Sequence, residues 1–115
     1  SAPFHSRFMA TIQDVFRDAL EFLLRYLTPQ KAASVTSNFT GHFHLEDMGK
    51  IIDHLTLQLS HTVRWRDNMK ALAQRAETIY EIGPGRPLRD FFRTLDLACQ
   101  SVTTLSAAER IFKTA

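Results

Sequence analysis

The sequence predicts a helix-rich α/β fold with two short parallel strands. Apolar residues recur at helical spacing in several separate stretches. Two short segments, Ser34–Asn38 and Thr78–Ile82, have the character of strands instead. Each is followed by a helical segment, and a helical crossover is the usual connection between parallel strands. Because two strands alone make a poor sheet, further strands are expected in residues that precede Ser1.

Length and composition indicate at most one domain in a reducing compartment. The chain has 115 residues, of which 44% are hydrophobic and 23% charged, with a net charge of +2. Basic residues are scattered among acidic ones, so no nucleic-acid surface is expected. No run of about 18 apolar residues exists, so no membrane segment is expected either. A single cysteine, Cys99, excludes an internal disulfide, fits a cytoplasmic location and is predicted to be a small buried residue on a helix.

The first predicted element is a long amphipathic helix. Ser6 is a plausible N-cap, and Pro29 should end the helix at Leu27 or Thr28. Its apolar stripe consists of Phe8, Ile12, Val15, Phe16, Ala19, Leu20, Leu23 and Leu27.

The middle of the chain predicts a strand and two further helices. The strand candidate lies within Ala33–Phe39 and runs into the polar turn at 38–41. Glu46 or Asp47 should cap the next helix, and a break at Ser60–Val63 should separate it from the one after. The stripes of these helices are Met48, Ile51, Ile52, Leu55 and Leu59, then Trp65, Met69, Leu72, Ala73 and Ala76.

The last third begins with the strand that enters a Gly-Pro-Gly turn. Gly83 and Gly85 are free to adopt positive φ, and Pro87 suits a first helical turn. The helix that follows has the stripe Leu88, Phe91, Phe92, Leu95 and Cys99. Residues 106–109, Ser-Ala-Ala-Glu, have the form of a capping box and predict a short final helix.

Several kinds of chemistry are disfavoured by the residue pattern. His42 and His44 flank one residue, but no cysteine or His-x₃-His completes a metal site, so both are interpreted as solvated loop histidines. The glycine turn at 83–85 lacks the spacing and the lysine of a phosphate-binding loop, which favours a structural turn. No Gly-x-Ser-x-Gly nucleophile elbow is present in the 115 residues.

Four motifs, in the same order along the chain, give the sequence a family resemblance. They are Ser1–Met9 (Ser-Ala-Pro-Phe-His-Ser-Arg-Phe-Met), Thr36–Gly41 (Thr-Ser-Asn-Phe-Thr-Gly), Leu57–Trp65 (Leu-Gln-Leu-Ser-His-Thr-Val-Arg-Trp) and Tyr80–Gly85 (Tyr-Glu-Ile-Gly-Pro-Gly). Together they resemble the acyl-CoA:acyl-carrier-protein acyltransferases, namely malonyl transacylases and the acyltransferase domains of polyketide synthases. The resemblance implies that residues 1–97 are the C-terminal part of such a domain and that residues 98–115 form a C-terminal helical tail. Thr62 departs from the family by replacing a proline.

The resemblance also implies a reaction and its participants. The family transfers an acyl group from coenzyme A to a serine and then to the pantetheine thiol of an acyl carrier protein, in polyketide or fatty-acid synthesis. His5 would be the general base, and the main-chain carbonyl of Gln58 would orient it. Phe4, an aromatic residue before the histidine, would favour malonyl over branched units. No cofactor is implied beyond the coenzyme A thioester substrate. The family's serine, oxyanion donors and carboxylate-binding arginine are expected in the missing N-terminal part.

Two alternatives remain open at this point. The same fold could serve an editing hydrolase that releases acyl groups to water, for which a carboxylate-binding arginine has no use. The chain could also be a non-catalytic structural or interaction fragment, which a test for activity addresses.

Overall fold

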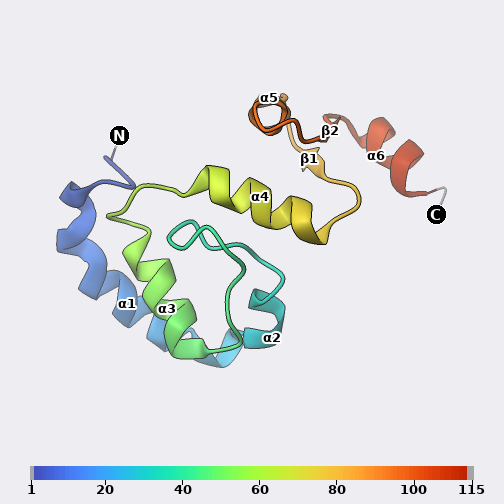
Figure 1. Ribbon diagram of the computed structural model, residues 1–115. Coiled ribbons are helices and arrows are strands. Elements are labelled where there is room, and N and C mark those ends of the chain that lie inside the picture. Colours follow the sequence, from blue (N-terminus) through green and yellow to red (C-terminus); the bar gives the residue numbers. More distant parts are fainter. Residues whose placement is uncertain (1, 114–115) are drawn as a thin grey trace. The chain divides into compact units, whose positions relative to one another are not determined.

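The protein is described here by a computed structural model that covers residues 2–113 (Figure 1). Within that range, six α-helices and one two-stranded parallel sheet confirm the predicted helix-rich α/β class. The chain forms two compact units, one up to Ala71 and the other from Leu72 onward. Their boundary falls within α4 (Trp65–Arg75), which starts after the predicted break at Ser60–Val63.

The first unit begins with a helical region that is more broken than predicted. A 3₁₀ segment, Arg7–Ile12, leads into α1 (Gln13–Phe22). A second 3₁₀ segment (Leu24–Tyr26) and the short α2 (Pro29–Ala32) follow. The prediction that Ser6 caps the first helix by its side chain is wrong, because its hydroxyl donates to the carbonyl of Pro3 at 2.6 Å instead.

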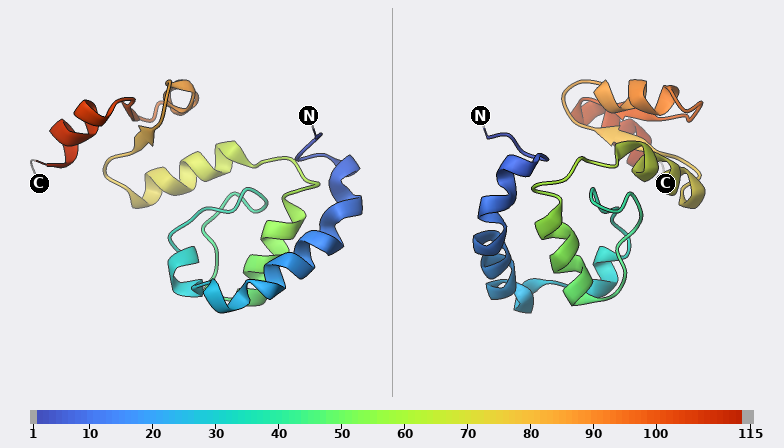
Figure 2. Two further views of the ribbon diagram at one scale, coloured as in Figure 1. Left: turned by 180° about the vertical axis from the view of Figure 1, so that it is seen from behind. Right: turned by 60° about the vertical axis from the view of Figure 1, so that its left-hand side comes forward.

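The core of the first unit forms where α1 lies alongside α3 (Met48–Leu57) (Figure 1, Figure 2). Of the two predicted caps for α3, Asp47 is the one used, and its side chain accepts from the Lys50 N–H at 2.9 Å. The buried apolar residues of this unit are Met9, Ile51, Ile52, Leu59, Met69 and Ala71. Ile51, Ile52, Leu59 and Met69 belong to the predicted stripes of α3 and α4, so apolar periodicity identified much of their inward faces. Met9 and Ala71 are buried outside those predicted stripes.

The strand predicted at Ser34–Asn38 does not form. Thr36 makes only an isolated antiparallel bridge to Phe43, so this segment is the start of a tight loop. The hydroxyl of Ser37 accepts from the N–H groups of Phe39 and Thr40, at 3.2 and 3.3 Å. Such side-chain bonds hold the backbone in a turn and compete with strand pairing.

The second unit contains the predicted strand–turn–helix. After β1 (Tyr80–Ile82), Gly83 and Gly85 adopt φ values of 151° and 111°, and α5 (Pro87–Arg93) begins with its proline. The prediction that this helix extends to Cys99 is wrong. Asp96, at φ 55°, turns the chain out of the helical direction soon after Arg93.

The partner of β1 is a strand that the sequence reading did not predict. β2 (Gln100–Val102) pairs with β1 in parallel, with Tyr80 opposite Gln100 and Ile82 opposite Val102. The parallel arrangement is therefore confirmed for this pair, with α5 as the crossover, whereas the predicted partner at 34–38 is replaced. β2 lies within residues 98–115, which were expected to be helical.

The final helix, α6 (Leu105–Phe112), packs against β2. Its cap is Thr104, whose hydroxyl accepts from the Ala107 N–H at 3.2 Å, so the helix starts before the predicted box at Ser106. Phe92 and Val102 are the buried apolar residues of this unit. Across residues 2–113, none of the helices combines the length and apolar character that a membrane crossing requires.

Candidate active site

His5 is bound to the C-terminal end of α3 by two hydrogen bonds. Its ring Nδ1 lies 2.8 Å from the main-chain oxygen of Gln58, and its N–H donates to the carbonyl of Leu59 at 2.9 Å. Gln58 is the C-cap of α3, where carbonyl groups lack partners within the helix. His5 has a φ of 61°, a left-handed conformation that is uncommon for residues other than glycine. Through its ring and its main-chain N–H, this one residue contacts two successive carbonyls.

The acceptor fixes the tautomer of the His5 ring. A carbonyl oxygen only accepts, so Nδ1 carries the hydrogen and Nε2 keeps its lone pair. The side chain is exposed, and within residues 2–113 no hydrogen bond reaches Nε2. The predicted contact with Gln58 is thus confirmed, while the catalytic role of His5 stays a prediction.

The side chain of Gln58 takes part in a second set of contacts. Its Oε1 accepts from Asn38 Nδ2 at 3.1 Å, and Asn38 Oδ1 accepts in turn from Asn68 Nδ2 at 3.3 Å. Asn68, on α4, is only 1% exposed. This chain of three amides links the end of α3 to the 36–43 loop and to α4. It fixes the residue whose carbonyl holds His5.

The loop that carries Asn38 is held close to the start of α4. The Arg64 N–H donates to the main-chain oxygen of Asn38 at 2.9 Å. Gly41 has a φ of 73°, and a Cβ on it would lie 2.5 Å from Cβ of Asp67. Only glycine fits there, since both the backbone conformation and the space exclude a side chain.

Asn38 and Asn68 were missed as supports of the site. Asn38 belongs to the Thr-Ser-Asn-Phe-Thr-Gly motif that carries the family resemblance, so a signal for it was present in the sequence. Asn68 had no such signal. It lies on the apolar face of α4, and only the structure shows that this polar residue is buried and therefore needs hydrogen-bond partners.

Phe4 precedes His5 in the chain and is 56% exposed. Its N–H donates to the carbonyl of Ala2 at 2.9 Å, which belongs to the turn leading into His5. Its role toward a substrate stays a prediction.

A second group of histidines lies on the loop and on α3. His44 and His54 have ring centroids 5.7 Å apart, and Phe39 contacts both His54 and His61. The interpretation of His44 as solvated is wrong, because its side chain is 8% exposed, whereas His42 is exposed. Burial lowers the pKa of His44, and the adjacent His54 lowers that pKa further. Within residues 2–113, no three His, Cys, Asp or Glu side chains are placed to share a metal ion.

In the second unit, Glu81 is a buried carboxylate with a structural task. Its two oxygens accept from the N–H groups of Leu88 and Arg89, each at 2.9 Å, and Ser101 Oγ donates at 3.4 Å. These are N–H groups of the first turn of α5, which have no acceptor inside the helix. The glutamate of the Glu-Ile-Gly-Pro-Gly motif therefore caps the helix beyond the glycine turn.

Comparison with known proteins gives one relative. Over 104 residues the chain is 29% identical to the polyketide biosynthesis protein PksE of Bacillus subtilis (strain 168). The aligned region is 90% of this chain but only 13% of the relative's length. No family model matches the chain, and no solved structure matches it.

Proposed function

We propose that this chain supplies the general-base histidine of an acyltransferase. The enzyme would move a malonyl or similar acyl group from coenzyme A, through a serine ester, to the thiol of an acyl carrier protein. The observation that carries the proposal is the hydrogen bond between His5 Nδ1 and the Gln58 carbonyl, because it leaves Nε2 exposed with its lone pair. Similarity to a polyketide biosynthesis protein supports polyketide synthesis as the setting, with fatty-acid synthesis as the related pathway.

In the first half-reaction, the serine oxygen attacks the thioester carbonyl carbon while Nε2 of His5 takes the hydroxyl proton. The C–S bond then breaks, and the proton on His5 passes to the sulfur of coenzyme A. In the second half-reaction, Nε2 takes the proton of the carrier's thiol as its sulfur attacks the serine ester. The serine oxygen then leaves and takes that proton from Nε2, which restores the serine hydroxyl and the neutral ring of His5. The Gln58 carbonyl holds the ring throughout by its bond to Nδ1–H.

The acyl preference is assigned to Phe4. A bulky side chain beside the base would fill the space that an α-methyl group needs. Discrimination of this kind against one extra carbon is worth about 1–3 kcal/mol. The proposal therefore names malonyl-CoA, rather than methylmalonyl-CoA, as the preferred donor. A competition between the two thioesters, read from the mass of the loaded carrier protein, tests this.

The proposal assigns the serine and the carboxylate-binding arginine to residues outside these 115. Its partners are acyl-CoA, the carrier protein and the segment that bears the serine. The isolated chain should accordingly load no carrier protein, because a base without its nucleophile has no covalent route.

The decisive experiment uses a protein that joins this chain to the serine-bearing segment. His5→Ala should lower carrier loading by several orders of magnitude, as loss of a catalytic triad member does. The matched control is His61→Ala, since His61 is also exposed and its Nδ1 also contacts a carbonyl near the end of α3, that of Leu57 at 2.7 Å. Full loading by His5→Ala would refute the proposal. Release of the acyl group to water, with no carrier loading, would identify a hydrolase instead.

A further inference from the structure

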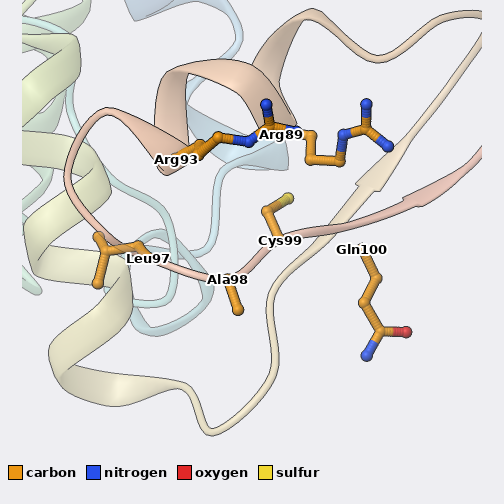
Figure 3. A pocket seen from close by; sticks show the side chains of 6 residues that line it. All are labelled: Arg89, Arg93, Leu97, Ala98, Cys99 and Gln100. Carbon is orange, nitrogen blue, oxygen red and sulfur yellow. The ribbon is translucent and has the colours of Figure 1, made fainter.

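A cavity in the second unit lies between α5 and the segment that leads into β2. Its volume is about 270 Å³. Figure 3 shows that Cys99 points its sulfur toward α5, with Arg89 and Arg93 on either side of it in this view. These arginines are one helical turn apart, so they share a face of α5. The lining residues are Arg89, Arg93, Leu97, Ala98, Cys99 and Gln100.

The two guanidinium groups have unused hydrogen-bond donors. Among residues 2–113 their ion-pair partner is Asp90, at 3.6 Å from Arg89 Nη2 and 3.7 Å from Arg93 Nη2. Both distances exceed the range of a hydrogen bond. Arg89 Nε is buried, and no acceptor within the described residues bonds to it. A buried donor without an acceptor is costly, so the surroundings of Arg89 are short of hydrogen-bond acceptors.

The acidic groups nearby do not cancel this positive character. Asp90 is a single carboxylate near two guanidinium groups, so a net positive charge remains. Both oxygens of Glu81 already accept main-chain N–H groups of α5. Burial raises the pKa of the Cys99 thiol, and Glu81 raises that pKa further, so the sulfur adds no negative charge at neutral pH.

We propose that this cavity binds a phosphate group. The two planar guanidinium groups extend from one face of α5, and each can donate more than one hydrogen bond. A phosphate has enough oxygens to accept from both groups, whereas a single carboxylate has only two oxygens. The cavity is slightly smaller than small-molecule sites, which occupy about 300–1,000 Å³, so it fits a phosphate group rather than a whole large ligand. The inference rests on α5 and its neighbours and does not depend on acyl transfer. The phosphate is either the free ion or part of a phosphorylated molecule such as coenzyme A.

The test uses Cys99 as a reporter, because it is the only thiol of the chain. The rate of its alkylation by neutral iodoacetamide is followed by mass spectrometry, with inorganic phosphate or with chloride at the same ionic strength. Only the unoccupied site reacts, so ligand at about ten times its Kd should slow alkylation about tenfold. Chloride should not slow it.

Variants show whether the arginines are responsible. Arg93→Gln is the safer substitution, because the Arg93 side chain is 74% exposed and its loss should not disturb folding. Arg93→Gln and Arg89→Gln should each weaken protection, and the double variant should lose it. Arg86→Gln, which removes the same charge from an exposed residue outside the cavity, should keep it.

Desulfo-coenzyme A and pantothenate distinguish the sources of the phosphate. If desulfo-coenzyme A slows alkylation at a lower concentration than inorganic phosphate does, and pantothenate does not slow it, the ligand of the cavity is a phosphorylated molecule. If desulfo-coenzyme A and inorganic phosphate slow alkylation at the same concentration, the ligand is the free phosphate ion. The proposal is overturned if neither phosphate compound slows alkylation, if the double variant keeps protection, or if Arg86→Gln loses it. Because acyl transfer is not measured, failure here leaves the proposed function untouched.

Discussion

The ring of His5 and the main-chain oxygen of Gln58 form a hydrogen bond of 2.8 Å, although 53 residues separate them in sequence. The acceptor is a peptide carbonyl, so no side-chain substitution at position 58 removes it. The contact requires that α3 ends near Gln58, because a carbonyl inside the helix would already accept a main-chain hydrogen bond. The orientation of the histidine is therefore encoded in the end of a helix.

The first prediction follows from this main-chain acceptor. In the protein that includes the serine-bearing segment, Gln58→Ala should keep the carbonyl and lose less than about tenfold in kcat/KM, or about 1.4 kcal/mol. His5→Ala should lose several orders of magnitude more. Steady-state loading of the carrier protein measures both. Equal losses in the two variants would show that the Gln58 side chain, not its carbonyl, positions the ring.

The second prediction concerns the three amides that support Gln58. Asn38→Ala removes a donor to Gln58 and an acceptor from Asn68, which is 1% exposed, so it should lower the free energy of unfolding by about 1–3 kcal/mol. Asn38→Ala combined with Gln58→Ala should cost less than the sum of the single changes, because they share one bond. Urea unfolding gives all three values. Gln74→Ala, on an exposed residue, is the control and should have little effect. Strict additivity would contradict the coupling.

The third prediction compares two glycines of the first unit. Gly41→Ala should be strongly destabilising, because φ is 73° and the new Cβ would lie 2.5 Å from Cβ of Asp67. Gly49→Ala should be neutral or stabilising by up to about 1 kcal/mol, since Gly49 is in α3 and its nearest contact would be an ordinary 3.4 Å. Thermal unfolding of the two variants measures the difference. A similar loss in both would mean that the loop does not pack on α4 as described.

The fourth prediction concerns the buried cap of α5. Glu81→Ala should lower stability by about 1–3 kcal/mol, because it leaves the N–H groups of Leu88 and Arg89 without their acceptors. Hydrogen exchange should speed up at those two amides first. Glu109→Ala removes an exposed carboxylate paired with Lys113 and should cost less than about 1 kcal/mol. Unchanged exchange at Leu88 and Arg89 would refute the capping role.

The fifth prediction is a pH dependence that comes from His44. Burial, with His54 adding to it, holds its pKa in the folded state below the usual 6.5. The unfolded chain therefore binds more protons just below that value, so stability is full above pH 6.5 and falls as pH drops toward the folded pKa. Urea unfolding at about pH 7.5 and about pH 5 measures this. His44→Phe should flatten the profile, whereas His42→Gln, on an exposed residue, should not. An unchanged slope in His44→Phe would assign the effect to other groups.

The parts of the fold that sequence predicted depend on local physical chemistry. The inward faces of α3 and α4 follow from apolar spacing, and the cap at Asp47 needs only its own turn. The turn at Gly83 and Gly85 follows from the φ range of glycine. The contact of His5 with Gln58 came from the family resemblance and not from the residues themselves, since nothing local joins them.

The parts that were missed depend on distant partners or on one backbone angle. Gln100–Val102 is a strand because β1 lies beside it, and its residues alone carry no clear strand pattern. The extension of α5 to Cys99 was plausible from apolar spacing, but the left-handed Asp96 overrides it. The segment around Thr36 has strand propensity, but the hydroxyl of Ser37 bonds to the backbone and holds the segment in a turn. The bonds among Asn38, Gln58 and Asn68 join three separate elements, so no local window contains them.

The distance in sequence between His5 and its acceptor also orders events during synthesis. His5 is made 53 residues before Gln58, so a growing chain carries an unoriented imidazole until α3 has been completed. Closing that loop costs entropy, which is recovered only when the two bonds to Gln58 and Leu59 form. The ring of His5 is therefore oriented late, and a ribosome-stalled chain that ends before α3 would carry it without its acceptor.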